Sequence, residues 1–75
     1  MTYELEVEDK RSVIDSHIRR LTYEKYNSEI SIIVEQTSAS IDNLMVSSLN
    51  EKVLDLSNKI QKLEEIKSEL NSQEN

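Results

Sequence analysis

The sequence predicts an all-α protein: a long two-helix antiparallel hairpin, similar to a coiled coil, that associates into a helical bundle. The 75 residues include no glycine and no proline, the residues that many-turned β proteins need for positive φ angles and turns. Apolar residues recur at every third or fourth place from Val46 to Leu70, as on one face of a helix. The hydrophobic fraction is 36%, below the roughly 45–50% of globular domains, as narrow helical stripes require.

The second helix is predicted over residues 43–71. With Val46 at heptad position a, seven of the eight a and d positions are apolar, which is a strong pattern. β-Branched residues at position a with leucine at position d favour a parallel two-stranded coiled coil. Additional apolar residues outside these positions widen the stripe and favour a bundle in which this helix also folds back along the first. The a positions are Val46, Val53, Ile60 and Lys67, the d positions are Leu49, Leu56, Leu63 and Leu70, and the widening residues are Leu44, Met45, Leu54 and Ile66.

The first helix is predicted over residues 9–36, and its apolar face changes direction along its length. Ile14, Ile18 and Leu21 share one face, whereas the apolar residues of the second half lie about 150° away at 100° per residue. Three interpretations are open: the helix breaks near Asn27, it continues with its halves facing different neighbours, or the segment 30–34 is a buried strand. We prefer the continuous helix. The residues of the second half are Tyr23, Tyr26, Ile30 and Ile33.

Three further segments complete the predicted single domain. Within residues 1–8, Tyr3, Leu5 and Val7 alternate with Glu4 and Glu6, which indicates either an extended arm or a frayed terminus. Residues 37–42 form the loop, and Ser40 or Asp42 caps the second helix. A second start at Ser48 also has capping-box spacing with Glu51. Residues 72–75 form a frayed polar tail.

Because so short a chain buries a small core, we expect it to gain burial by forming a homo-oligomer, either a dimer or a tetramer. Tyr23 and Tyr26 suit either an interface or a core pair against the second helix, and we prefer the core pair. The predicted helix-association interface consists of Ile14, Ile18, Leu21, Tyr23, Tyr26, Ile30, Ile33, Val46, Leu49, Val53, Leu56, Ile60, Leu63 and Leu70.

No combination of residues indicates an enzyme, a cofactor site or a metal site. His17 is the single histidine and there is no cysteine, so the ligand sets of zinc and iron sites cannot be assembled. Without glycine there is no phosphate-binding loop. The serines and threonines have no neighbouring base in a nucleophile motif. We therefore expect a protein without catalytic, cofactor-binding or metal-binding residues.

The formal net charge of −6 argues against a nucleic-acid partner, since phosphate binders present a basic face. No apolar run approaches the ~20 residues that span a bilayer, and the N-terminus lacks the pattern of a signal peptide. We therefore expect a cytoplasmic protein without a membrane partner.

The segments VEDK (7–10), SHIR (16–19) and YEKY (23–26), followed by a heptad region, resemble small uncharacterised proteins encoded by tailed phages of marine bacteria. The resemblance covers the first third of the chain well and the rest only in pattern. It implies a virion-associated or host-directed accessory protein, found in the host cytoplasm or the virion, and it carries over no functional residue.

From the residues, the predicted function is structural or scaffolding, through helix–helix self-association. The alternative is an adaptor or inhibitor that binds a host or viral protein by one helical face.

Overall fold

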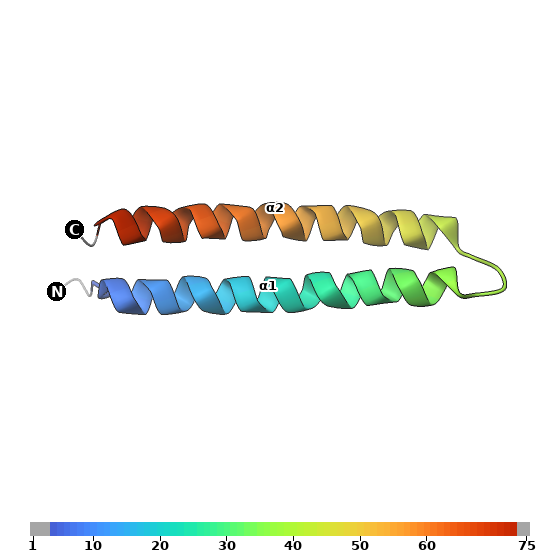
Figure 1. The fold of residues 1–75 in the computed structure, drawn as a ribbon, viewed down its shortest axis with the longest axis horizontal. Helices are drawn as coiled ribbons and strands as arrows, with labels where there is room; N and C mark the ends of the chain where they lie inside the picture. Colours follow the sequence, from blue (N-terminus) through green and yellow to red (C-terminus); the bar gives the residue numbers. More distant parts are fainter. Residues whose placement is uncertain (1–3, 74–75) are drawn as a thin grey trace.

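The computed structural model describes residues 4–73, which form two antiparallel helices joined by a short loop. Helix α1 is Val7–Gln36 and helix α2 is Asn43–Gln73. The helices lie side by side along their whole length, so the chain enters α1 and leaves α2 at the same end (Figure 1). The molecule measures 59 × 21 × 17 Å. The predicted all-α hairpin is confirmed.

Helix α1 runs unbroken through Asn27, where a break was one of the three interpretations, and residues 30–34 are helical rather than a strand. The chain contains no proline, which would remove a backbone hydrogen bond of the helix, and no glycine, which has a low helix propensity. The absence of both residues explains why α1 is continuous. The helix ends at Gln36, and the N–H and the hydroxyl of the C-cap residue Thr37 both donate to the carbonyl of Val34, at 3.2 and 2.7 Å.

The first helix begins at Val7, two residues earlier than predicted. Glu6 is the N-cap and has an extended backbone (φ −65°, ψ 157°), but its side chain makes no capping hydrogen bond. Glu8 and Asp9 lie in the first turn, where their charges suit the positive end of the helix dipole. The predicted arm of residues 1–8 is therefore too long, because Val7 and Glu8 are helical. Its first three residues lie outside the described part of the chain.

The loop is fixed by its last residue, Asp42. The Asp42 carboxylate accepts a hydrogen bond from the Met45 N–H at 3.1 Å, and the Asp42 N–H donates to the carboxylate of Glu35 at 3.0 Å. Of the two predicted caps, Asp42 is the one that makes this bond. Ser48 lies inside α2 and starts no helix. Because one residue both caps α2 and binds the end of α1, the direction of the chain reversal is set locally.

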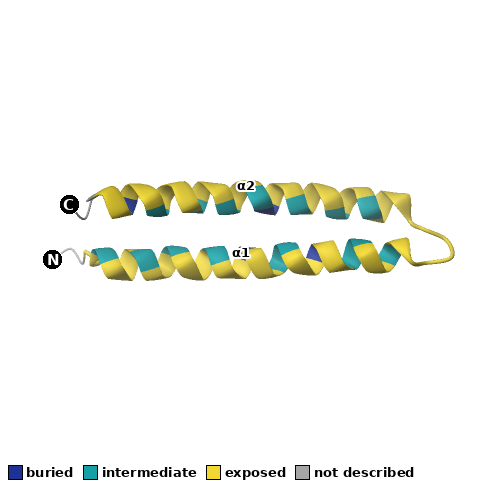
Figure 2. Cartoon of the chain, viewed as in Figure 1, coloured by how far each residue is buried: buried dark blue, intermediate teal, exposed yellow. Residues whose placement is uncertain are grey.

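The helices bury a narrow seam, by which we mean the residues of each helix that face the other at alternating spacings of four and three. Figure 2 shows the buried and half-buried residues gathered on the facing sides of the two helices. In α2 the seam contains all eight predicted a and d positions, each buried or half-buried. In α1 it contains Val7, Arg11, Ile14, Ile18, Leu21, Lys25, Ser28, Ile32 and Glu35.

Two cross-helix contacts define the register near the open end of the hairpin. The Arg11 Nε–H donates to Asn71 Oδ1 at 3.1 Å, and Lys67 Nζ lies 2.7 Å from Asp15 Oδ1. From the first contact to the second, α1 advances by four residues and α2 goes back by four. The same register places Ser28 level with Leu54. Ser28 is 2% exposed. Its small side chain occupies the seam where the sequence offers no apolar residue.

Candidate interaction surface

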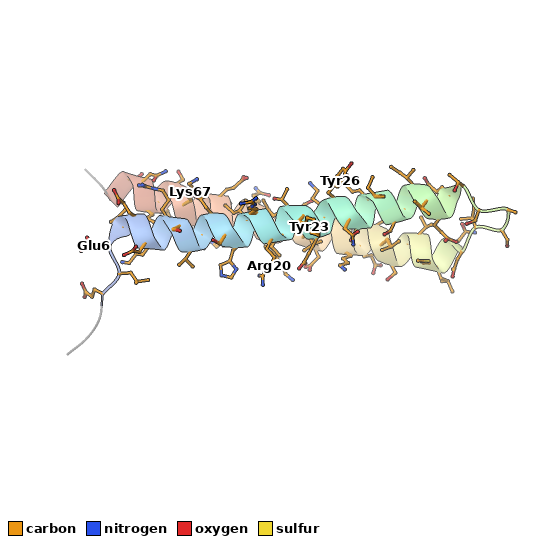
Figure 3. All side chains as sticks on the ribbon, turned by 90° about the horizontal axis from the view of Figure 1, so that it is seen from below. Glu6, Arg20, Tyr23, Tyr26 and Lys67 are labelled. Carbon is orange, nitrogen blue, oxygen red and sulfur yellow. The ribbon has the colours of Figure 1, made fainter. Side chains whose placement is uncertain are left out.

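Helix α1 carries a second apolar face, which we call the outer ridge: Tyr23, Tyr26, Ile30 and Ile33. These residues are separated by three, four and three positions, so they form a continuous stripe along about two heptads. The seam residues of the same half of α1 face α2, and the ridge lies on the far side of the helix. In Figure 3, which looks onto the outer side of α1, Tyr23 lies on that side.

The ridge is exposed in the single chain. The exposed fractions are 76% for Tyr23, 64% for Tyr26, 38% for Ile30 and 56% for Ile33. The prediction that the two tyrosines pack against the second helix is therefore wrong. The seam of α1 keeps its direction throughout, because Lys25, Ser28 and Ile32 continue the spacing begun by Leu21, and this places the tyrosines outside.

At the centre of the outer ridge, the side chains leave a shallow, open groove between them. It is lined by Tyr23, Tyr26, Asn27 and Ile30. Three of these four residues belong to the ridge, and the fourth, Asn27, is polar. Tyrosine combines a large apolar body with a polar tip, which is typical of protein interfaces.

Charged side chains border the ridge unequally. Arg19 and Arg20 lie just before it on α1, and Arg20 Nη2 lies 3.2 Å from Nδ1 of His17. Beyond the ridge, the last turn of α1 contains no basic residue. Glu29 lies beside the middle of the ridge and is exposed. The surface thus has a basic end and an end that carries the negative pole of the helix.

The predicted association residues divide into two sets. The seam within the chain brings together Ile14, Ile18 and Leu21 of α1 with all seven predicted residues of α2. The four ridge residues lie on the opposite side of α1 and are exposed. Sequence reasoning missed the other six seam positions of α1, which are Val7, Arg11, Lys25, Ser28, Ile32 and Glu35. Their signal was the unchanged spacing of four and three that runs in both directions from Ile14, Ile18 and Leu21.

The exposed leucines of α2 form no comparable stripe. Leu44 and Leu54 both point outward, with 85% and 63% exposure. The exposed residues between them include Ser47 and Glu51, which line the same groove as Leu54. Isolated apolar residues of this kind are ordinary on protein surfaces. The outer ridge is therefore the continuous apolar face that the hairpin leaves uncovered in its described residues.

Candidate metal ligands and grooves were compared with the ridge over residues 4–73. Among residues 4–73, no three histidine, cysteine, aspartate or glutamate side chains gather to hold a metal ion. The grooves on the surface are shallow, and the one over the first half of α1 is lined by charged and hydroxyl side chains of a single helix, including Glu8, Arg11 and Asp15.

Neither helix in the described range combines the length and apolarity needed to cross a membrane. The chain matches no protein-family model, no curated protein and no solved structure.

Proposed function

We propose that this protein is a non-enzymatic structural or scaffolding element that acts by helix–helix self-association. The observation that carries the proposal is the outer ridge, which is apolar, regularly spaced and exposed, whereas the exposed Leu44 and Leu54 of α2 form no such stripe. Contact between an apolar stripe and water is unfavourable, and burying apolar surface contributes roughly 25 cal/mol of stabilising free energy per Å². A helix that covers the ridge supplies this stabilisation.

The small core of the hairpin supports the same proposal. In the described residues, the buried apolar side chains are Leu21, Leu56 and Leu70, which are 8%, 4% and 8% exposed. Two long helices with so few buried side chains depend on every added contact, because small folds have little stability in reserve. Association through the ridge would therefore stabilise the hairpin as well as the assembly.

The resemblance to phage-encoded proteins suggests a setting for this activity. We propose an accessory role in a virion or in the cytoplasm of a host, where a small self-associating hairpin would hold itself or another protein in place. An interaction protein of this kind needs a surface rather than a pocket, and a surface is what the described residues offer.

The test is the particle mass in solution across concentration. Sedimentation equilibrium from about 1 to 200 µM should show an average mass that rises from the monomer value of 8.7 kDa. The melting temperature should rise over the same range, because association stabilises the folded chain by mass action. A constant monomer mass with a constant melting temperature would refute self-association.

The spacing of the ridge also favours one alternative function. Helices that insert into a groove of a partner present anchors at i, i+3 and i+7, and Tyr23, Tyr26 and Ile30 have this spacing. An adaptor or inhibitor would use the ridge for a host or viral protein. This function predicts a chain that stays monomeric at every concentration and whose ridge is covered in a stoichiometric complex.

A further inference from the structure

We infer that the outer ridge binds the outer ridge of a second copy in the antiparallel direction, with each α1 placing Arg19 and Arg20 beside the C-terminal end of the other α1. The inference rests on the proposed self-association and goes further by naming the surface, the occupant and the orientation.

The spacing of the ridge favours a second copy as its occupant. The intervals of three, four and three residues read the same in both directions along α1. When two copies are antiparallel and centred at the level of residue 28, Tyr23 of one lies level with Ile33 of the other. Tyr26 then lies level with Ile30. Each aromatic side chain meets an aliphatic one, and every ridge residue is covered.

The charges at the two ends of the ridge favour the antiparallel direction. In this arrangement Arg20 lies level with Gln36 of the partner copy, in the last turn of α1, where no basic residue is present. Cations are stabilising at the C-terminal end of a helix because its free carbonyls carry partial negative charge. In a parallel pair, Arg19 and Arg20 would instead lie beside the same two arginines, which repel one another.

One like-charge contact is specific to this geometry. Glu29 borders the ridge close to the two-fold axis, so the two copies bring their Glu29 side chains to the same edge of the contact. In a parallel pair this glutamate would lie near Val34 of the other copy, because the borders of two parallel helices meet with an offset. Neutralising Glu29 should therefore strengthen an antiparallel association and leave a parallel one unchanged.

The resulting assembly is a row of four helices, with the two α1 helices in the middle and an α2 helix on each outer side. The contact covers about two heptads of each copy. An interface of that size falls in the class of weak and reversible ones, so the association depends on concentration.

The orientation can be measured with one spin label per chain. The sequence contains no cysteine, so Ser12→Cys gives a single labelling site on an exposed part of α1, away from the ridge. At a rise of 1.5 Å per residue, antiparallel copies centred at residue 28 place the two labels about 50 Å apart. Parallel copies place them within about 20 Å. Double electron–electron resonance at about 200 µM distinguishes the two distances.

Matched variants test the surface. Ile33→Gln changes a ridge residue that is 56% exposed, and Val13→Gln changes a residue on the same helix that is 50% exposed and lies outside the contact. Glutamine has a higher helix propensity than either residue, so both hairpins should fold, as circular dichroism verifies. Ile33→Gln should weaken association at least about tenfold, a loss of roughly 1.4 kcal/mol, whereas Val13→Gln should leave it unchanged.

Charge variants test the direction independently. Glu29→Gln should tighten the association about twofold, and Arg19→Gln with Arg20→Gln should weaken it about two- to fivefold, in line with exposed charge effects. A label distance near 20 Å, or equal effects of Ile33→Gln and Val13→Gln in a chain that does associate, would overturn this inference and leave self-association standing. A chain that is monomeric at all concentrations would overturn the proposed function itself.

Discussion

Asp15 and Lys67 form an ion pair across the hairpin, with Oδ1 and Nζ 2.7 Å apart, although Lys67 occupies an a position of the heptad pattern. A lysine in a seam can lay its aliphatic stem along the apolar contact and extend its ammonium group to the edge. The ammonium group there meets the carboxylate of the facing helix. Together with the contact of Arg11 and Asn71, this pair specifies how the open end of the hairpin aligns.

The pair should contribute modestly to stability because both side chains are partly exposed, 49% for Asp15 and 35% for Lys67. A double-mutant cycle with Asp15→Asn and Lys67→Gln, measured by urea unfolding, should give a coupling of about 0.2–1 kcal/mol at low salt. The coupling should disappear in 1 M NaCl because salt screens exposed charges. The control is the same double-mutant cycle on Lys59 and Asp55, a more exposed ion pair within α2. A coupling that is unaffected by salt would contradict this account.

Leu56 and Leu54 offer a direct comparison between the seam and the surface. Leu56 is 4% exposed and Leu54 is 63% exposed, two positions away in the same helix. Leu56→Ala should reduce the free energy of unfolding by about 2–5 kcal/mol because it leaves a cavity. Leu54→Ala should change it by about 0.5 kcal/mol or less. Thermal unfolding followed by circular dichroism measures both, and similar losses would mean that the seam is placed incorrectly.

The two helix starts should respond differently to loss of the N-cap side chain. Asp42→Ala removes the carboxylate that accepts from the Met45 N–H, and should cost about 1 kcal/mol of unfolding free energy. Glu6→Ala removes a side chain that makes no capping bond, so the cost should be a few tenths of a kcal/mol at most, from the helix dipole. Urea titration of the two variants gives the comparison, and a larger loss for Glu6→Ala would contradict it.

The second helix could be predicted from the sequence except for its last two residues, because α2 continues to Gln73 and the predicted frayed tail of residues 72–75 is too long by Ser72 and Gln73. Seven of its eight seam positions are apolar, and the polar exception, Lys67, did not disturb the pattern. Its N-cap followed from a local rule, since aspartate at this position accepts a bond from the helix backbone. Patterns of this kind need no knowledge of the partner helix.

The seam of α1 could not be predicted in its second half because the residues that face α2 there are mostly polar. Lys25, Ser28 and Glu35 continue the geometric spacing but carry no hydrophobic signal, while Tyr23 and Tyr26 carry a strong one on the other side. Hydrophobicity alone therefore selected the outward face. The register of the facing helix decides which stripe is covered, and that depends on the loop and on pairs such as Asp15 with Lys67.

The start of α1 was misjudged for a related reason. The alternation before Val7 favours an extended chain, yet Val7 also lies four residues before Arg11 and so extends the seam spacing by one position. Contact with α2 stabilises the helical conformation at Val7. A local sequence pattern carries no information about that contact.

The start of α1 and the end of α2 lie at the same pole of the hairpin, and this has a mechanical consequence. Anything attached before Val7 or after Gln73 is carried at the pole opposite the loop, away from the ridge. If two hairpins join ridge to ridge as inferred, their attachment points face outward at the two ends of the pair, about 60 Å apart at 1.5 Å per residue. Such a pair would act as a reversible spacer. It would hold two attached proteins at a fixed distance and release them on dilution.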